Sequence, residues 1–383
     1  MVTVRPMAAA EWPALVEILA QSFNFPAAGW DSFRARLGDD NFRVACDGAR
    51  IVGGCGIYRM GQVWMGRSVP LAGLAGVGVA PDMRGKGVAR TMMTSVLREL
   101  RASGAPMAGL YPASWQVYRA AGYDLAGERV QWELPLPALA GFRAELPVVP
   151  VDPASPEATA AFASRYRPAH GNLDRSPAIW DRLAKPHVGS RYGWLIGNDA
   201  YVILGHTPAD APHWDIEVFD LHAPTAAAGR TILSLLGGHR SLSDKVRWYG
   251  SPADALVTLL PEPQVTVAQC QRWMLRIVDF PAALAGRGWP RGMAGELHVD
   301  VDDPLLVEHA GAWVITVSDG RAVVRPGGRG ELKLTSRSLG PLYSGYLSAT
   351  ALVAAGLASG PDAALELADA LFAAPTPWMR EMY

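Results

Sequence analysis

The N-terminal third of the chain switches repeatedly between the hydrophobic periods of helices and strands. Apolar residues recur at helical spacing from Glu11 to Phe23 and from Val88 to Arg101, so both stretches are expected to be amphipathic helices. Shorter runs that suit strands are Phe42 to Cys46, Ile51 to Tyr58, Leu71 to Val79, Met107 to Tyr111 and a run that begins at Tyr123. A short helix is expected at Ser114 to Ala121. This alternation predicts a domain of the α/β type.

The middle third repeats the later half of this order. The strand-like runs AYVILGH, from Ala200, and DIEVFDL, from Asp215, precede a helical stretch from Ala226 to Leu236, and KVRWYG, from Lys245, follows as a strand. The first domain has a glycine-rich turn between its strand and its helix, and the second has none. The pattern therefore predicts a second α/β domain that lacks this turn.

The last third opens with four short strand-like runs and closes with two helical stretches. The strands are ELHVDV, WVITVSD, AVVRP and ELKLT, and the helices span Leu339 to Leu357 and Pro361 to Phe372. The segment RPGGRG, Arg325 to Gly330, has the length and glycine content of a hairpin turn. These features predict a small α/β domain.

Proline and glycine mark the expected domain boundaries. Prolines crowd the stretch from Leu134 to Pro156, where they would interrupt a helix or a sheet ladder, so a connector is expected there. A second break, AGRGWPRG, spans Ala285 to Gly292. The predicted domains are therefore residues 1–145, 146–285 and 286–383.

The composition indicates a folded, multi-domain protein without a nucleic-acid or membrane partner. The chain has 383 residues, of which 50% are hydrophobic, a formal net charge of −1 and no long run of lysine and arginine. Its three cysteines form no CxxC pair and its N-terminus lacks a clean apolar signal-peptide region, so a cytoplasmic location is expected. The uncharged stretch from Ser338 to Pro361 contains many small residues and suits a buried helix better than a bilayer span. The histidines lie far apart without an HExxH motif, so no metal site is expected.

The strongest local signal is GVGVAPDMRGKGVARTMM, in which the segment from Val77 to Arg90 links a strand to a helix. Gly85 and Gly87 carry no Cβ atoms, which allows a ligand to approach the backbone. The first amides of a helix have no partner within the helix, and the helix dipole adds positive charge there. A diphosphate group would therefore bind well at this turn.

Three basic residues, Arg84, Lys86 and Arg90, add full positive charges around the turn. The alternative is an ordinary surface turn with solvated basic residues. A Walker loop does not fit, because Lys86 is not followed by serine or threonine. A dinucleotide fingerprint does not fit either, because no acidic residue closes the next strand at the required distance. The segment favours binding of a diphosphate group without nucleotide hydrolysis.

The second motif is PASWQVYRAAGY, from Pro112 to Tyr123. The hydroxyl of Tyr118 could protonate a thiolate leaving group, because a phenol is a hydrogen-bond donor with a pKa close to that of a thiol. The alternative is that Tyr118 packs in the core with its hydroxyl bound to a backbone carbonyl. Tyr123 is expected to be a packing residue.

Both motifs resemble those of the GNAT superfamily of N-acetyltransferases. Arg84, Gly87 and Ala89 match the acetyl-CoA loop pattern Arg/Gln-x-x-Gly-x-Gly/Ala. The second motif resembles the Tyr-x-x-x-Gly-Tyr/Phe element of that superfamily, with Tyr118 as its first residue. The resemblance implies that Tyr118 is the general acid.

The resemblance also implies that acetyl-CoA is the co-substrate. In the superfamily, the strand before the loop pairs with the pantetheine arm, and Val77 and Val79 are the corresponding residues here. The residues implied for acetyl-CoA binding are Val77, Gly78, Val79, Arg84, Gly85, Lys86, Gly87, Val88, Ala89, Arg90, Ala113 and Ser114.

The order of the three predicted domains resembles the Eis (enhanced intracellular survival) family of bacterial acetyltransferases within this superfamily. The similar segments are SFNF at Ser22, VYRAAGY at Val117, WMLRIVDFPAALAGRGW at Trp273, ELKLTSRSLGPLYSGYLSATALVAAG at Glu331 and the C-terminal tail, so they extend over nearly the whole chain. The resemblance implies an α/β (α+β) fold of two tandem GNAT-like domains, the second without the acetyl-CoA loop. A domain similar to sterol carrier proteins would follow. Family members are commonly homohexamers, so a hexamer is implied as well.

The same resemblance assigns the general base to the free carboxylate of the C-terminal residue, here Tyr383. An amine must be neutral to attack a thioester, so a group has to accept its proton. A terminal carboxylate has a reference pKa of roughly 3.3–3.7, so it would mainly orient the amine and collect the proton. The tail contains Trp378, Met379 and Met382, and this apolar character predicts that it docks rather than frays.

Two positions depart from the family pattern. Met382 stands where members often have an acidic residue, and an aspartate of the substrate pocket is replaced by Asn24 or deleted. Both changes reduce the negative charge that would attract an aminoglycoside. The implied substrate pocket consists of Asn24, Phe25, Phe33 and Gly76, with core packing as the alternative role of the aromatic residues.

The predicted function is transfer of an acetyl group from acetyl-CoA to a primary amine by direct attack. An aminoglycoside-like polyamine, a lysine side chain and a small metabolite amine all remain open as acceptors. The alternative is a non-catalytic protein that binds a lipid or another apolar ligand in its last domain, or that senses acetyl-CoA.

Overall fold

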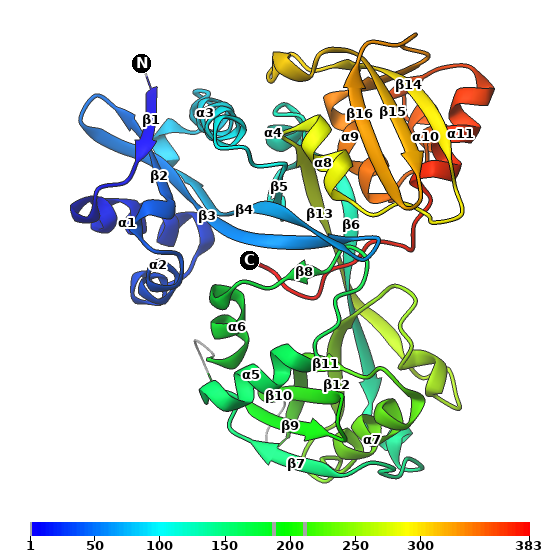
Figure 1. Cartoon of the computed structure of the whole chain (residues 1–383). Helices are drawn as coiled ribbons and strands as arrows, with labels where there is room; N and C mark the ends of the chain where they lie inside the picture. The colour runs from blue at the N-terminus through cyan, green and yellow to red at the C-terminus, as the bar shows by residue number, and fades with distance from the viewer. Residues whose placement is uncertain (1, 186–188, 210–212) are drawn as a thin grey trace.

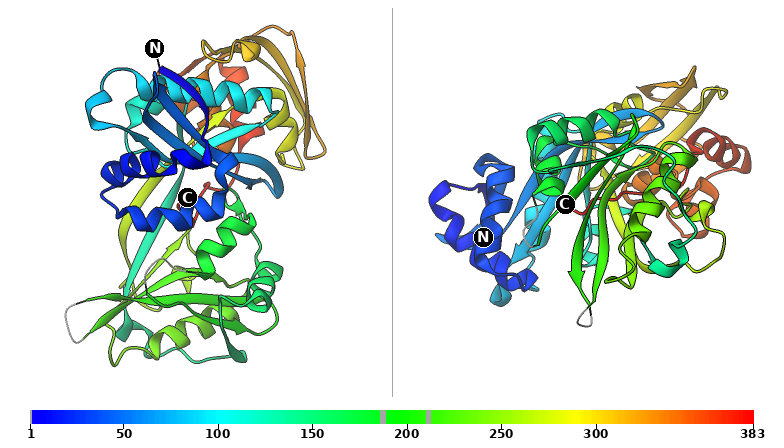
Figure 2. Two further views of the ribbon diagram at one scale, coloured as in Figure 1. Left: turned by 90° about the vertical axis from the view of Figure 1, so that its left-hand side faces the viewer. Right: turned by 90° about the horizontal axis from the view of Figure 1, so that it is seen from below.

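The computed structural model describes residues 2–185, 189–209 and 213–383. The chain forms two lobes joined by long strands, with a third domain beside the first lobe (Figure 1). Across the described residues, one sheet of 13 strands runs through both lobes, and a sheet of 5 strands belongs to the third domain. The C-terminal tail returns from the third domain to the space between the lobes, as the two further views also show (Figure 2).

In the first lobe, the strands lie side by side in chain order and helices cover both faces of the sheet. The strands are β1 (Val2–Pro6), β2 (Phe42–Asp47), β3 (Arg50–Trp64), β4 (Arg67–Val79) and β5 (Met107–Leu110). The helices are α1 (Trp12–Phe23), α2 (Asp31–Leu37), α3 (Val88–Ala102) and α4 (Trp115–Arg119). Because side chains alternate along a strand, Val44 of β2 packs on the α1 side of the sheet and Ala45 packs on the α3 side.

The second lobe repeats this arrangement with β7 (Val148–Val151), β9 (Tyr192–Ile196), β10 (Ala200–Pro208), β11 (Trp214–His222) and β12 (Lys245–Gly250). Helices α7 (Ala226–Gly237) and α5 (Pro156–Arg165) pack on opposite faces of its sheet. Helix α6 (Pro177–Ala184) and the short strand β8 (Leu173–Asp174) lie nearer the first lobe (Figure 1).

The predicted connector from Leu134 to Pro156 is wrong in part, because β7 lies inside it. Proline lacks a backbone N–H, and a central strand needs its N–H groups to pair with neighbours on both sides. In the described structure β7 is an edge strand that pairs only with β9, so Pro150 is tolerated there. The prediction failed because it did not consider an edge position.

Two long strands exchange between the lobes. β6 (Asp124–Pro135) begins in the first lobe, and its residues 130–135 pair with β12 of the second. β13 (Thr266–Ile277) begins in the second lobe, and its residues 274–277 pair with β5 of the first. The two strands also pair with each other in antiparallel register. The part of the sheet in each lobe is therefore completed by a strand that starts in the other lobe, and this exchange ties the lobes together.

The third domain has a sheet in the order β16–β15–β14–β17–β18. Its strands are β14 (Gly295–Asp302), β15 (Gly311–Ser318), β16 (Arg321–Pro326), β17 (Leu332–Thr335) and β18 (Ala358–Ser359). Its helices are α8 (Phe280–Gly286), α9 (Ser336–Ser344), α10 (Ala349–Ala354) and α11 (Asp362–Phe372). Helix α9 packs against β6 and β13, which joins this domain to the strands that link the lobes.

Two expectations for the third domain are wrong. Arg325 to Gly330 is not a hairpin turn, because β16 pairs with β15 whereas β17 pairs with β14 on the other side of the sheet. The predicted helix from Leu339 to Leu357 is two helices, because α9 ends at Gly345, whose φ of 72° is left-handed. None of the described helices combines the length and the apolar character that a membrane span requires.

Candidate active site

The candidate site is centred on the place where β4 and β5 separate. These strands pair in parallel register only through residues 71–73 of β4 and 107–109 of β5. Beyond Gly73, β4 continues to Val79 with β3 as its only partner among the described strands. An unpaired strand edge presents N–H and C=O groups that an extended ligand can pair with.

A β-bulge bends β4 within the stretch that no longer pairs with β5. The register with β3 shifts between Gly54 and Gly56, so β4 contains one extra residue there. Gly76 has a φ of 58°, and a Cβ atom at this position would lie 3.3 Å from Phe33 and 3.4 Å from Trp30. The fold therefore brings two of the predicted pocket residues, Gly76 and Phe33, into contact.

The loop from β4 to α3 exposes backbone amides. After a short turn (Pro81–Met83), Gly85 and Gly87 have φ values of 75° and 81°, which side chains rarely adopt. Gly87 is the N-cap residue of α3 and provides no side-chain cap. Within the described residues, no hydrogen-bond partner is found for the amides of Gly85, Gly87, Val88 and Ala89. The N-terminus of α3 is thus free to bind an anion.

These features fit acetyl-CoA. Arg84, Lys86 and Arg90 are exposed around the loop, and none of them forms an ion pair with a described residue. Free amides, a helix N-terminus and three uncompensated cations suit a diphosphate group. The free edge of β4, which includes Val77 and Val79, suits an extended arm that contains amide groups.

Tyr118 lies in α4, which follows β5 after a short exposed stretch that includes Ala113 and Ser114. The side chain is buried, its ring packs edge-on against Tyr123 at 6.1 Å, and its hydroxyl has no hydrogen-bond partner among the described residues. Burial raises the pKa of Tyr118 to about 12, and the neighbouring Cys55 adds to this shift. The hydroxyl therefore stays protonated at neutral pH and is available to donate a proton.

The C-terminal tail runs along β6 from the third domain. The amide of Glu128 donates to the carbonyl oxygen of Pro377 at 3.1 Å, and the amide of Met379 donates to that of Glu128 at 3.0 Å. The Asn172 amide group donates to the carbonyl oxygen of Trp378 at 2.8 Å. The tail is therefore paired like an added strand, which confirms the prediction that it docks.

Two side chains of the first lobe hold the next residues of the tail. Arg129 Nε donates to the carbonyl oxygen of Arg380 at 2.7 Å. The hydroxyl of Tyr111, the residue that follows β5, donates to the carbonyl oxygen of Glu381 at 2.8 Å. These bonds fix the backbone of the tail directly before its last two residues.

The ring of Tyr383 fills the point where β4 and β5 separate. A ring carbon lies 2.6 Å from the position of a Cβ atom on Gly73, and the hydroxyl lies 2.8 Å from that on Gly109. The rings of Tyr58 and Tyr111 pack edge-on against Tyr383 at 6.1 and 5.9 Å. Its hydroxyl is buried without a hydrogen-bond partner, so packing alone holds the ring.

Buried charges of the second lobe anchor the tail. Asp220 of β11 accepts hydrogen bonds from Arg175 at 2.6 and 2.9 Å and from Arg380 at 2.7 Å. Arg175 also donates to Glu381 at 2.6 Å, and the Tyr201 hydroxyl donates to Asp220 at 2.7 Å. Two arginines and two carboxylates thus neutralise one another. None of the described ion pairs involves the C-terminal carboxylate, which leaves it available to a substrate.

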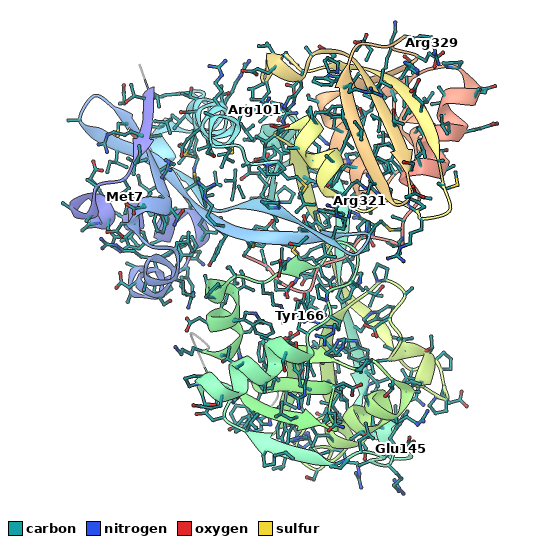
Figure 3. All side chains as sticks on the ribbon, viewed as in Figure 1. Met7, Arg101, Glu145, Tyr166, Arg321 and Arg329 are labelled. Atoms are coloured by element: carbon teal, nitrogen blue, oxygen red, sulfur yellow. The ribbon has the colours of Figure 1, made fainter. Side chains whose placement is uncertain are left out.

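The positive and negative charges of this buried network balance each other. Burial alone would raise the pKa of Asp220, but the charges of Arg175 and Arg380 outweigh it and lower the pKa to about 2. Arg175 also stacks on the ring of Tyr166 at 3.8 Å, in the part of the second lobe that faces the tail (Figure 3). Buried charges are tolerated only when each has a partner. The network therefore determines where the tail lies, and with it Tyr383.

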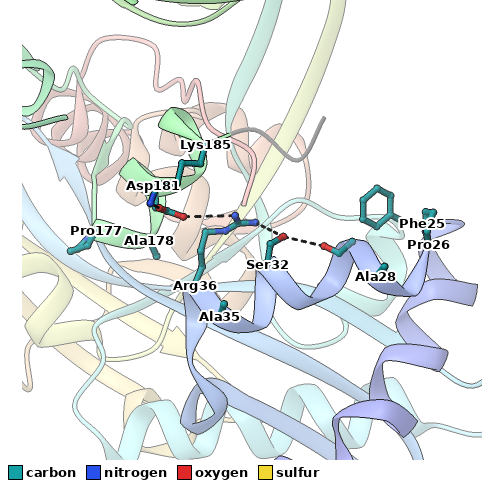
Figure 4. Close-up of a pocket in the computed structure, with 11 residues that line it drawn as sticks. Phe25, Pro26, Ala28, Ser32, Ala35, Arg36, Pro177, Ala178, Asp181 and Lys185 are labelled. Atoms are coloured by element: carbon teal, nitrogen blue, oxygen red, sulfur yellow. Dashed lines mark hydrogen bonds and ion pairs between the residues drawn. The ribbon is translucent and has the colours of Figure 1, made fainter. Parts of the chain in front are cut away.

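A groove of about 820 Å³ lies between α2 of the first lobe and α6 of the second (Figure 4). Phe25 lines one end, and Arg36 and Asp181 approach each other across the groove at 3.9 Å. Asn24 is exposed at the end of α1, where its φ of 49° forms a left-handed cap. Phe33 lies deeper and packs on Tyr58. The predicted pocket residues thus extend from this groove toward the aromatic side chains beside Tyr383.

Several residues of the site were not predicted from the sequence: Gly73, Gly109, Tyr58, Tyr111, Arg129, Arg175 and Asp220. A local signal existed for the two glycines, because the tripeptide Ala-Gly-Leu occurs at 72–74 and at 108–110 and the β4–β5 pairing aligns the first two residues of each copy. No such signal existed for the charged residues, because their partners are distant in the sequence.

Comparison with known proteins adds independent support. Residues 3–126 and residues 171–277 each match an acetyltransferase (GNAT) domain family, and residues 280–380 match a sterol carrier protein domain family. The crystal structure of a GCN5-related N-acetyltransferase from Anabaena variabilis ATCC 29413 is 34% identical, covers 100% of both chains and has a TM-score of 0.95. N-acetyltransferase Eis of Mycobacterium tuberculosis (strain ATCC 25177 / H37Ra) is 28% identical in an alignment that covers 96% of each chain. The crystal structure of Eis1 from Mycobacterium abscessus is 25% identical, covers 100% of both chains and has a TM-score of 0.83.

The fold and these matches define an acetyl-CoA-dependent N-acetyltransferase with tandem GNAT domains and a sterol-carrier-like domain, which confirms the predicted fold class and reaction class. The chain belongs to the Eis family of the GNAT superfamily, as its motifs predicted.

Proposed function

We propose that the enzyme transfers an acetyl group from acetyl-CoA to a primary amine by direct attack, at the place where β4 and β5 separate. The observation that carries this proposal is the position of Tyr383, whose ring lies on Gly73 and Gly109. The free edge of β4 leads from this point to Val79 and the loop before α3. A diphosphate at that loop and a pantetheine arm along the edge would direct the thioester toward the tail.

The acetyl-CoA site of this proposal consists of Val77, Gly78, Val79, Arg84, Gly85, Lys86, Gly87, Val88, Ala89, Arg90, Ala113 and Ser114. The amides of the loop and the three cations would bind the diphosphate. The acceptor amine would approach past Asn24, Phe25, Phe33 and Gly76. These assignments follow the free amides, the unpaired strand edge and the groove in Figure 4.

Two groups would handle protons in the reaction. The carboxylate of Tyr383 would orient the attacking amine and accept its proton as the C–N bond forms. When the C–S bond breaks, Tyr118 would donate its proton to the sulfur. A pKa of about 12 suits this role, since Tyr118 carries its proton at every pH at which an amine acceptor reacts. Each step leaves a stable neutral product, the amide and the free thiol.

The core cavity of the third domain does not favour the alternative function of lipid binding. The cavity found in its core, between Leu339 and the β-sheet, has a volume of about 10 Å³. This is roughly the space of one water molecule, whereas ligand pockets typically measure roughly 300–1,000 Å³. Arg287 is also buried in this core, with its guanidinium 4.6 Å from the ring of Trp289. We therefore propose a structural role for this domain, which positions the start of the tail.

Assembly and location are proposed from the family alone. We expect a cytoplasmic homohexamer, which sedimentation velocity of the purified protein would test. A sedimentation coefficient of a monomer or dimer at micromolar concentration would contradict it.

The direct test is a thiol-release assay with acetyl-CoA and a panel of primary amines. Tyr118→Phe is expected to lower kcat by about 10²-fold, as general acids commonly contribute, and to leave the affinity for CoA unchanged. Tyr123→Phe is the matched control, because it removes a buried, unpartnered hydroxyl from a ring that packs against Tyr118. Equal turnover of the two variants would remove Tyr118 from the mechanism. Absence of thiol release with every amine would refute the proposed function.

A further inference from the structure

A cavity of about 310 Å³ lies between the second lobe and the tail, beside the last residues of the chain. Apolar side chains line part of it, among them Ile179, Leu183 and Phe219. Among the described residues, the ionisable side chains in its wall, apart from a tyrosine, are Arg129, Arg182, Arg191, Arg380, Glu217 and Glu381. Four arginines therefore face two glutamates.

Two of these charges are already neutralised outside the cavity. Arg380 forms an ion pair with Asp220 at 2.7 Å, and Glu381 forms one with Arg175 at 2.5 Å. The charge balance of the cavity therefore depends on three arginines and Glu217.

The three arginines have no carboxylate partner among the described residues. Arg129 donates to two neutral acceptors, the carbonyl oxygen of Arg380 at 2.7 Å and the Gln271 amide oxygen at 2.8 Å. The guanidinium of Arg191 lies 3.1 Å from the centre of the Phe219 ring, and its Nε is buried without a hydrogen-bond partner. Arg182 forms no ion pair in the described structure. The cavity thus holds three desolvated positive charges that form no ion pair with a described residue, against the single carboxylate of Glu217.

The pKa values agree with this view. Burial lowers the pKa of Arg191 to about 10, and only the charge of Glu217 opposes the shift. Burial lowers the pKa of Arg182, partly opposed by the Tyr58 hydroxyl, and the charges of Arg36 and Arg129 lower it further. Burial also raises the pKa of Glu217 to about 6, so this carboxyl is mostly ionised at neutral pH, but its single negative charge offsets only one of the three positive charges. A bound anion would relieve the cost of these buried cations.

The cavity adjoins the reaction centre. Met382 lines it and is joined to Tyr383, whose ring packs on Tyr58 at 6.1 Å. Arg182 lines the same cavity and neighbours the Tyr58 hydroxyl. An acceptor whose amine lies at the C-terminal carboxylate could therefore extend its other end into the cavity.

We propose that the natural acceptor is an amine that carries an anionic group, a carboxylate or a phosphate, which binds to Arg129, Arg182 and Arg191. This inference rests on the proposed acetyl transfer and specifies its substrate. Guanidinium groups bind both kinds of anion in bidentate geometry. Ile179 and Leu183 would contact an apolar linker between the amine and the anion. A polyamine is disfavoured, because its second ammonium group would face these arginines.

The test compares acceptors that differ only in the charge at the far end. ω-Amino acids with chains of three to six carbons, their primary amides, diamines of equal length and aminoalkyl phosphates would be assayed by thiol release. For at least one chain length, we expect kcat/KM of the carboxylate or of the phosphate to exceed those of the amide and the diamine at least tenfold. Whichever anion is faster identifies the source of the negative charge. Equal values across the series, or a preference for diamines, would overturn the inference.

Variants locate the effect in the cavity. Arg182→Gln and Arg191→Gln are expected to raise KM for the anionic acceptor at least tenfold, with kcat and the KM of the matching amide nearly unchanged. Arg191→Lys should restore part of the affinity, and Arg143→Gln, at an exposed site of the second lobe, is the control. An equal rise in KM for the anionic acceptor and its amide would indicate a structural role and overturn the inference.

Binding without turnover separates this inference from the proposed function. Calorimetry with hexanoate, which has no amine, should show binding to the wild type in the presence of CoA and weaker binding to Arg182→Gln and Arg191→Gln. Absence of binding to hexanoate and to inorganic phosphate would overturn the anion site. Acetyl transfer at equal kcat/KM to acceptors with anionic, neutral and cationic far ends would also overturn the anion site, but it would leave the proposed function intact.

Discussion

The two lobes contain the same strand arrangement, but only the first has the features of an acetyl-CoA site. In each lobe a long strand pairs in parallel with a shorter one over a brief ladder and then separates from it, β4 from β5 and β11 from β12. The first of these strands has a bulge in both lobes, near Gly76 in β4 and at Phe219 in β11. The strand layout alone therefore does not make a binding site.

The difference lies between the strand and the following helix. In the first lobe the chain runs from Val79 to Val88 through two glycines with positive φ, and the amides at the start of α3 are free. In the second lobe the chain runs from His222 to Ala226, and the side chain of Thr225 accepts a hydrogen bond from the amide of Ala228 at 3.2 Å. A helix whose amides are already capped has little to offer a diphosphate.

The tail enters both openings with different side chains. At the second opening, Arg380 donates to the carbonyl oxygens of Tyr249 at 2.8 Å and Leu221 at 2.6 Å, just beyond the paired residues of β12 and β11. At the first opening, Tyr383 lies on Gly73, the last paired residue of β4. The second lobe therefore acts as an anchor that holds the tail and positions the C-terminus in the first lobe.

The largest expected effect comes from removing the anchor. Asp220→Asn would leave Arg175 and Arg380 without their shared counter-ion, and breaking a buried network of this kind costs about 3–5 kcal/mol. Urea unfolding would measure this loss, with the exposed Asp199→Asn of the same lobe as control. Equal stabilities of the two variants would show that the network does not hold the tail.

The next effect concerns the carboxylate that the anchor positions. A protein with a C-terminal amide, made by semisynthesis, retains the ring of Tyr383 but loses the negative charge. We expect kcat to fall by about 10²–10⁴-fold, the range of a lost general base, while the Kd of CoA is unchanged. Steady-state kinetics and calorimetry provide the two measurements. Full turnover of the amidated enzyme would exclude the carboxylate from the chemistry.

A smaller effect is expected from the loop of the first lobe. Gly87→Ala places a side chain at a φ of 81°, at a cost of about 1–2 kcal/mol, which would raise the Kd of CoA about tenfold if the loop moves to relieve it. Gly104→Ala is the matched control, because Gly104 follows the other end of α3 with a φ of 76° and equally open surroundings. Calorimetry should separate the two variants. An equal Kd would argue against binding at the start of α3.

The smallest effect is expected in the second lobe. Thr225→Ala removes the cap of α7 and should lower the free energy of unfolding by about 1 kcal/mol. The number of CoA molecules bound per chain should stay at one, because the short connection from His222 to Ala226 still lacks the glycine turn. A second binding event in calorimetry would show that the cap alone had prevented CoA binding in the second lobe.

Much of the fold was predictable because its signals are local. The periodicity of Val88 to Arg101 predicts α3, and glycine and arginine at fixed spacing predict the loop before it, since both depend only on neighbours in the chain. The tail was predicted to dock from its apolar residues, and it does. The prediction of a single helix from Leu339 to Leu357 was wrong, because the periodicity did not show that Gly345 would end the first helix.

What the sequence by itself determined, then, are several of the helices, among them α1, α3, α7 and α11, most strands, the glycine turn and, through its motifs, the family. The tertiary structure alone decided that β6 and β13 exchange lobes, that Asp220 pairs with Arg380, and that three arginines share one cavity without an ion pair to any described residue. The physical reason is distance along the chain. Charge pairing and burial depend on groups that only the folded sheet brings together, and no local pattern records those partners.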